Sequence, residues 1–376
     1  MSDKSRYIDG IDGNAGTYPS ADNSSLDTSL IAWKRLQPLL RKSVNGGQCF
    51  SNGIVSTYPL VYTSSTGYAG GILTPNGDVY FIPNSAAIGQ KISSSGVVST
   101  YSLIYTYNGN CSGAILTPNG DIHFVPRSSP VGQKIDTSGT VSTYSLIYTT
   151  TNAYHGGILS TSGEVHFIPR EASVGQKISL SGVVSTYSLI YTASNIYRGA
   201  VLAPNGDIHF IPLNATVGQK ISSSGVVSTY SLVYTVANAY FGGVLAPNGD
   251  IHFIPMTAAV GMKISSSWVV STYSLVYTVG GNGAYAGGVL SPNGDIHFVP
   301  YAATVGQKIS SLGVVSTYSL VYIVGGGTAT HHGGILTSNG DIHFIPFNAT
   351  VGQKISTLSG IPFDQNICLS PFFNKL

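Results

Sequence analysis

Residues 243–277 read GVLAPNGDIHFIPMTAAVGMKISSSWVVSTYSLVY, and their pattern predicts the fold of the chain. Its Asn248-Gly249 pair is typical of a tight hairpin, because both central positions of such a turn need a positive φ. Around this turn the residues are rich in Val, Ile, Tyr and Thr, which favour strands. We therefore predict four short strands, at 243–246, 250–254, 260–264 and 269–277.

The same pattern occurs seven times along the chain. The acidic residue that follows the hairpin turn recurs every 43 to 46 residues, at Asp78, Asp121, Glu164, Asp207, Asp250, Asp295 and Asp341. The first tyrosine of the VSTYSLVY motif recurs at Tyr58, Tyr101, Tyr144, Tyr187, Tyr230, Tyr273 and Tyr318. Four strands in each of seven such units predict an all-β fold, a seven-bladed β-propeller with four-stranded blades. The alternative is a solenoid, but its end repeats should be atypical caps, and here they are not.

The two ends of the repeat region are complementary. The seventh unit stops after Lys354-Ile355-Ser356 and lacks its own VSTYSLVY strand, while an unpartnered copy of that strand precedes the first unit. We predict that the N-terminal strand at 54–62 pairs with 351–356, which closes the ring and leaves few open strand edges. The predicted propeller spans residues 47–360.

The repeat resembles a known family. The string GGVLAPNGDIHFIP at 242–255, with the VGQKI and VVSTY motifs, is similar to a kelch-like propeller repeat of poorly characterised proteins from protists and their large DNA viruses. The resemblance covers residues 50–360 and implies a propeller. It does not imply an activity, because propellers include both binding modules and enzymes.

The flanking segments differ in composition. Residues 1–46 hold 11 of the 32 charged side chains, and we predict a helix near 28–42 in this N-terminal extension, packed on the propeller rim or docking a partner. Residues 361–376 form a C-terminal tail. Cys49 and Cys368 flank the two ends that the ring brings together, and we interpret them as reduced thiols, with a closing disulfide as the alternative.

Composition narrows the function. Only 9% of residues are charged and the net charge is +2, without the basic clusters that nucleic-acid binding requires. No apolar run is long enough to span a bilayer, and the N-terminus lacks the apolar region of a secretory signal. We therefore expect a cytoplasmic or virion protein that does not bind nucleic acid.

Residues that recur in every unit are interpreted as structural. We expect the acidic residues either to form ion pairs with one lysine per unit or to be solvated with it at the rim; the lysines are Lys91, Lys134, Lys177, Lys220, Lys263, Lys308 and Lys354. One position holds histidine in six units and Tyr80 in the first, and we predict buried side chains with hydrogen bonds between blades. The histidines are His123, His166, His209, His252, His297 and His343. Packed sheets lie too far apart for these side chains to share one metal ion. Because no catalytic motif is present, we predict no catalytic residue, metal site or cofactor.

Two positions vary between otherwise constant neighbours. The residue before the Gly-Gly pair, or before its Ser-Gly and Gly-Ala variants, reads Ala69, Cys111, His155, Arg198, Phe241, Ala286 and His332. The residue after the Ile-Pro or Val-Pro pair reads Asn84, Arg127, Arg170, Leu213, Met256, Tyr301 and Phe347. Because strands alternate in direction, both positions should lie on one face, with the first set around the channel mouth. The constant PNG and SSSG turns should lie on the opposite face.

The variation separates two kinds of side chain. One arc is cationic, and the other is apolar and aromatic and ends at His331 and His332. Arginine and aromatic residues dominate the energetics of protein interfaces. We therefore predict a non-enzymatic scaffold that binds a protein partner through this face, in a larger assembly such as a virus particle. The alternative is that the variation is neutral drift on exposed loops. The predicted site consists of Cys111, Arg127, His155, Arg170, Arg198, Phe241, Met256, Tyr301, His331, His332 and Phe347.

Two other functions remain open at this stage. One is a glycan-binding, lectin-like propeller, in which tyrosines near the channel mouth stack on sugars. The tyrosines are Tyr68, Tyr154, Tyr197, Tyr240 and Tyr285. The other is an enzyme that uses the central channel.

Overall fold

The computed structural model describes residues 54–106, 109–278, 283–323 and 328–357, and two further short strands. These are β1 (Tyr7–Ile8) and β2 (Ala15–Gly16), which pair antiparallel within a separate unit, Met1–Leu39. The predicted helix near 28–42, the tail at 361–376, Cys49 and Cys368 all lie outside the described residues.

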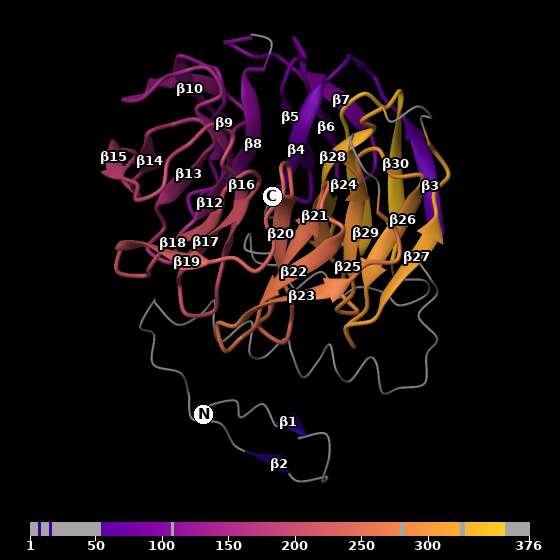
Figure 1. Cartoon of the computed structure of the whole chain (residues 1–376). Helices are drawn as coiled ribbons and strands as arrows, with labels where there is room; N and C mark the ends of the chain where they lie inside the picture. Colours follow the sequence, from indigo (N-terminus) through magenta and orange to yellow (C-terminus); the bar gives the residue numbers. More distant parts are fainter. Residues whose placement is uncertain are drawn as a thin grey trace. The chain divides into compact units, whose positions relative to one another are not determined.

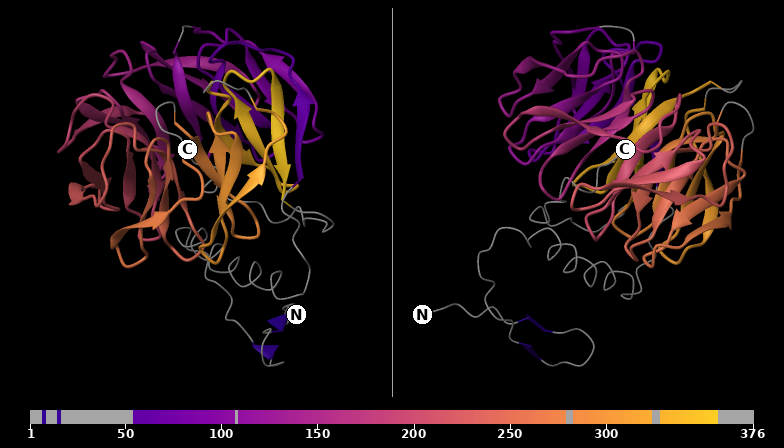
Figure 2. Two further views of the ribbon diagram at one scale, coloured as in Figure 1. Left: turned by 45° about the vertical axis from the view of Figure 1, so that its right-hand side comes forward. Right: turned by 60° about the vertical axis from the view of Figure 1, so that its left-hand side comes forward.

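The described part of the second unit is a seven-bladed β-propeller, as the repeats predict. Seven four-stranded antiparallel sheets stand around a common centre (Figures 1 and 2). We number the blades in chain order by their innermost strand, so that blade 1 begins with β4 and blade 7 with β28.

Each blade runs from the inner strand outward. The inner strands are β4 (Tyr68–Leu73), β8 (Cys111–Leu116), β12 (Tyr154–Leu159), β16 (Tyr197–Leu202), β20 (Tyr240–Leu245), β24 (Tyr285–Leu290) and β28 (His331–Leu336). The second strands are β5 (Val79–Pro83), β9 (Ile122–Pro126), β13 (Val165–Pro169), β17 (Ile208–Pro212), β21 (Ile251–Pro255), β25 (Ile296–Pro300) and β29 (Asp341–Pro346). The third strands are β6 (Gly89–Ile92), β10 (Val131–Ile135), β14 (Val174–Ile178), β18 (Val217–Ile221), β22 (Val260–Ile264), β26 (Val305–Ile309) and β30 (Val351–Ser356). The outer strands are β7 (Val98–Tyr101), β11 (Val141–Ser145), β15 (Val184–Ser188), β19 (Val227–Ser231), β23 (Val270–Ser274), β27 (Val315–Ser319) and β3 (Ile54–Pro59).

The predicted closure of the ring is confirmed. Strand β3 is the outer strand of blade 7 and pairs antiparallel with β30, so that Ile54 lies opposite Ser356 and Pro59 opposite Val351. In Figure 1 the indigo start of the propeller lies beside its yellow end. The first and last described segments of the propeller therefore share one sheet.

The hydrophobic core lies between neighbouring blades. In one such cluster Ile211 of blade 4 packs with Tyr240 and Phe253 of blade 5, and all three side chains are fully buried. Similar clusters recur around the ring. Because each core needs two blades, a blade is stable only beside its neighbours.

The predicted pairing of lysines with acidic residues is confirmed in all seven blades. The lysine Nζ lies 2.6–2.9 Å from a carboxylate oxygen of its own blade. In four blades the second carboxylate oxygen accepts the backbone N–H of the turn between the third and outer strands, as Asp78 does from Ser94. The pairs therefore hold the two constant turns together.

The six repeated histidines are buried as predicted, but the predicted hydrogen bonds between blades are wrong. His123 and His343 make hydrogen bonds within their own blade, to Tyr144 and Tyr58. Both ring nitrogens of His209 lack a partner among the described residues. Its ring instead meets the ring of Tyr230 edge-on and stacks on Trp268 of the next blade.

A glycine explains this contact. The tyrosine ring lies across the third strand of its blade, where a Cβ on Gly218 would stand only 2.2 Å from the ring of Tyr230. The repeated tyrosine can therefore reach the histidine on the second strand, and the contact between them is one of ring packing more than of hydrogen bonding.

In six of the seven blades a repeated glutamine joins the blade to the one before it. Its side-chain oxygen accepts two backbone N–H groups that follow the outer strand of the preceding blade, at 2.7–3.1 Å. The glutamines are Gln90, Gln133, Gln176, Gln219, Gln307 and Gln353. Blade 5 has a fully buried methionine, Met262, at this position.

We expect Gln219→Met to lower the free energy of unfolding by about 2–4 kcal/mol, because two partly buried N–H groups lose their acceptor. Met262→Leu is the matched control and should cost less than about 1.5 kcal/mol, since it conserves volume in the same place. Urea unfolding followed by circular dichroism measures both. Equal losses in the two variants would show that the glutamine contributes only packing.

Candidate functional site

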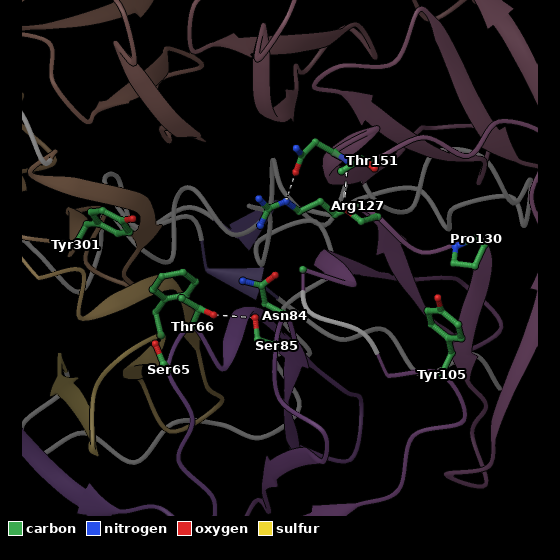
Figure 3. Close-up of a pocket in the computed structure, with 13 residues that line it drawn as sticks. Ser65, Thr66, Asn84, Ser85, Tyr105, Arg127, Pro130, Thr151 and Tyr301 are labelled. Atoms are coloured by element: carbon green, nitrogen blue, oxygen red, sulfur yellow. Dashed lines mark hydrogen bonds between the residues drawn. The ribbon is translucent and has the colours of Figure 1, made fainter.

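The two predicted sets of loops do meet on one face, where they form a basin of about 980 Å³. Some residues of its lining belong to the loops that precede the inner strands. The others belong to the loops that connect the second strands to the third strands. Figure 3 shows Arg127 and Tyr301 reaching toward this space from different blades. The channel-mouth basin is lined by Ser65, Thr66, Asn84, Ser85, Tyr105, Gly109, Arg127, Ser128, Pro130, Thr151, Asn152, Tyr301 and Phe347. A concavity of this size is typical of ligand sites.

The second varied set forms a backbone belt around the propeller. At each position the carbonyl oxygen accepts an N–H from just before the inner strand of the next blade, at 2.6–3.0 Å. The seven carbonyls belong to Asn84, Arg127, Arg170, Leu213, Met256, Tyr301 and Phe347, and the last bond, to Gly67, completes the circle. Because the backbone alone makes these bonds, the belt does not depend on which side chain a position carries, and the side chains differ between blades.

The first varied set closes the channel and does not ring its mouth on exposed loops as predicted. His155, Phe241 and His332 lie on inner strands and are at most 6% exposed. The ring centre of Phe241 lies 4.6 Å from that of His332 and 5.2 Å from that of His155. The guanidinium group of Arg198 lies 4.4 Å from the ring centre of Phe241. We call these four residues the channel plug. Only about 10 Å³ remains free among them, which is at most one water molecule.

Two predicted site residues lie elsewhere. Cys111 is paired with Pro126, and His331 is paired with Pro346, across the first two strands of their blades. In blade 3 the residue with the same partner is Tyr154, which is paired with Pro169. They therefore occupy the buried tyrosine position between blades, and the channel residue of blade 2 is Ser112, which lines the small cavity of the plug. The error at Cys111 arose because Ser112-Gly113 reads like a variant of the Gly-Gly pair, which shifts the alignment by one residue. The prediction includes His331 only because it adjoins His332. Burial raises the pKa of the Cys111 thiol, so this thiol is not a nucleophile at neutral pH.

The tyrosines of the lectin hypothesis are also core residues. Tyr68, Tyr154, Tyr197, Tyr240 and Tyr285 are at most 2% exposed, and each hydroxyl donates to a backbone carbonyl of the third strand region. The prediction that they stack on sugars is wrong, because none of these rings reaches the surface.

Two arginines of the basin face converge on one asparagine. Arg127 Nε and Arg170 Nη1 both donate to Asn152 Oδ1, at 2.9 and 3.0 Å, and Arg170 Nε donates to Asn195 Oδ1 at 2.6 Å. Both asparagines have a positive φ, of 57° and 52°, which asparagine tolerates better than most residues. Sequence reasoning did not select these asparagines, although an Asn in the loop before an inner strand was a usable signal.

The positive charge at this face is not neutralised by ion pairs. Arg127, Arg170 and Arg198 are the three arginines of the propeller, and none forms an ion pair with another described residue. Burial, with smaller effects of neighbouring arginines, lowers the pKa of Arg198 to about 9 and that of Arg170 to about 10. Both guanidinium groups therefore stay charged at neutral pH.

The plug histidines are neutral for the same reasons. Burial, reinforced by the charge of Arg198, lowers the pKa of His332 to about 3 and that of His155 well below its ordinary value. These imidazoles add no charge and leave the arginines as the source of positive potential. Over the residues that the structure describes, no group of His, Cys, Asp and Glu side chains is arranged to hold a metal ion.

An aromatic sector borders the arginines. Tyr301 and Phe347 line the basin with ring centres 6.2 Å apart, and Phe347 stacks on His332 at 5.3 Å. Tyr301 also lies 6.4 Å from Phe241. Met256 is half-buried in the belt and is not part of the basin lining. The cationic and aromatic arcs of the sequence thus meet in one place, where Arg198 covers the face of Phe241.

Comparisons with known proteins give the fold. No family model matches the sequence, and no curated protein matches it. The structure is similar to that of a streptogramin B lyase, with a TM-score of 0.70 at 18% identity over 82% of this chain and 99% of the other. It is also similar to virginiamycin B lyase from Staphylococcus aureus, with 0.70 at 15% over 81% and 99%, and to Kuenenia stuttgartiensis hydrazine synthase, with 0.60 at 13% over 79% and 97%.

Within the described ranges, no helix is long and apolar enough to cross a membrane. Identities of 13–18% carry no argument about activity, because one fold serves many functions. The comparisons therefore agree with the β-propeller architecture and leave the function to the chemistry of the basin.

Proposed function

We propose that this propeller is a non-enzymatic binding module that holds a protein partner at the channel-mouth basin. The observation that carries the proposal is the backbone belt, which keeps seven loops in one geometry while their side chains differ. A rigid scaffold that presents varied side chains in a concavity is a common design for recognition. The half-exposed Tyr301 and Phe347 supply apolar anchors, the residue type that dominates interface energetics.

The setting we propose is a larger assembly, such as a virus particle. The low charged fraction of 9% suits a protein that is packed against others. The resemblance of the repeat to proteins of protists and their large DNA viruses supports the same setting. The lectin alternative has lost the tyrosines on which it rested, and the plug fills the channel that an enzyme would use.

We expect Tyr301→Ala and Phe347→Ala each to raise the dissociation rate of the partner about 10- to 30-fold, as loss of a desolvated anchor does. The partner is first identified in native extract with a photo-crosslinking residue at position 151, on the exposed rim of the basin, and a second one at Ser223 as background. Purified partner is then measured on a biosensor.

Asn205→Ala and Ser223→Ala are the controls, because both residues belong to the constant turns of the opposite face. If these variants release the partner and the basin variants do not, the partner binds the constant face and the proposal is wrong.

A further inference from the structure

Every lysine of the described propeller forms an ion pair with a carboxylate, whereas none of its arginines does. The seven lysines form ion pairs beside the constant turns. Arg127, Arg170 and Arg198 come from three consecutive blades, 2 to 4, and gather at the basin. One carboxylate, that of Glu171, acts electrostatically on Arg127 and Arg170, and no ion pair forms with it among the described residues. The cluster therefore keeps a net positive charge.

The cluster is held in place by specific contacts. Asn152 accepts from two guanidinium groups and Asn195 accepts from one, so that Arg127 and Arg170 share an acceptor and lie side by side. Arg170 is only 8% exposed. The Nε of Arg198 is buried and has no hydrogen-bond partner among the described residues. Like charges held together and out of water are unfavourable unless an anion offsets them.

The neighbouring side chains further limit the class of ligand that fits this site. Arg127 lines the basin itself, while Arg170 and Arg198 stand behind it and add to the positive potential. Tyr301 and Phe347 line the same basin and offer aromatic surface. A guanidinium group binds carboxylate or phosphate through two parallel hydrogen bonds, and an aromatic wall packs against an apolar group. A bare inorganic anion would use only half of this site.

We propose that the arginine cluster is an oxyanion site for a carboxylate or phosphate group that carries an apolar or aromatic substituent. The oxyanion binds Arg127 in the field of Arg170 and Arg198, and the substituent packs on Tyr301 and Phe347. This inference rests on the proposed function, in which the oxyanion belongs to the segment that the protein partner inserts into the basin.

Isothermal titration of the full-length protein tests the site with small probes. We expect phenyl phosphate and benzoate to bind, inorganic phosphate to bind at least about tenfold more weakly, and neutral phenol not to bind measurably. The stronger of phenyl phosphate and benzoate identifies the oxyanion. Binding should weaken when the ionic strength rises, because the attraction is between charges.

Two substitutions locate the site. We expect Arg127→Gln to lower the affinity for the better probe about 10- to 100-fold, as loss of a charge-assisted hydrogen bond does. Arg170→Gln removes a charge from behind the basin and should lower the affinity by a smaller factor, because Arg170 acts on the oxyanion only through its field. Arg127→Lys keeps the charge without the planar fork and should fall between wild type and Arg127→Gln. Lys134→Gln removes the same charge from the far end of blade 2 and should bind as wild type does. Thermal unfolding confirms that each variant is folded.

Other outcomes overturn the inference. It is wrong if neither aromatic anion binds the wild-type protein, or if Lys134→Gln loses as much affinity as Arg127→Gln. It is also wrong if phenol binds as tightly as phenyl phosphate, because the site is then merely apolar. The proposed function survives these failures when the partner still crosslinks at the basin rim and still depends on Tyr301. Conversely, the proposed function alone is wrong if the anions bind as expected but no partner depends on the residues of the basin.

Discussion

We expect the propeller to lose most of its stability when the pH falls from 7.5 to about 5.5. The six repeated histidines are at most 8% exposed, and burial lowers the pKa of each to about 4. In the unfolded chain the same groups titrate near 6.5. The unfolded state therefore binds more protons than the folded state between about pH 6.5 and 4, and acid favours unfolding throughout that window.

The size of the effect follows from the same shift. Lowering the pH from 7.5 to 5.5 costs about 1.3 kcal/mol for each buried histidine, or about 8 kcal/mol for the six. The whole stability of a typical domain is about 5–15 kcal/mol. Urea unfolding at pH 7.5, 6.5 and 5.5, followed by near-ultraviolet circular dichroism, measures the loss.

A triple variant separates the histidines from other titrating groups. Tyr80 occupies the same position in blade 1, so His123→Tyr, His209→Tyr and His297→Tyr together should keep the fold. The plug histidines and His331 are also buried with a lowered pKa, so the loss between pH 7.5 and 5.5 should fall to about two thirds, because three of the nine buried histidines no longer titrate. A wild-type protein that is equally stable at both pH values would contradict the buried, neutral state of these histidines.

We expect removal of residues 1–63 to abolish cooperative folding. The deletion removes β3, which pairs with β30 over six residues, and leaves blade 7 without its outer strand. It also removes Tyr58 and Leu60, which pack against the core cluster of blade 1, and the two N–H groups that Gln90 accepts. Near-ultraviolet circular dichroism and size-exclusion chromatography should show a chain without fixed tertiary structure.

A rescue variant makes this test specific. Residues 222–235, the outer strand of blade 4 with its preceding turn, are placed after Ile355 in the truncated chain, since Ile221 and Ile355 hold the same repeat position. This chain should fold again, because any outer strand of the repeat can fill the position. If the truncated chain folds as well as the rescued one, ring closure by β3 is dispensable and our account of blade 7 is wrong.

The architecture could be predicted from the sequence. Strand count, blade count, ring closure and the lysine–acid pairs all follow from local signals that occur seven times, such as the hairpin at Asn248-Gly249. Each blade has the same local sequence pattern, so the strands predicted for one repeat are predicted for all of them. The placement on one face of the loops before the inner strands and the loops after the second strands also follows, since alternate strands run in opposite directions.

The surroundings of the varied side chains could not be predicted from the sequence and depend on the packing of the blades. Whether Arg198, Phe241 and His332 stand at a rim or fill a channel depends on how closely seven inner strands approach one another, and no local pattern encodes that distance. A one-residue shift placed Cys111 on the wrong side of its strand, and the prediction includes His331 as the neighbour of His332 although successive side chains of a strand point in opposite directions. Arg127 and Arg170 are 43 residues apart in the chain and share one amide oxygen only because blades 2 and 3 are neighbours. The candidate site is therefore a product of ring closure, in which side chains from several blades meet around one axis.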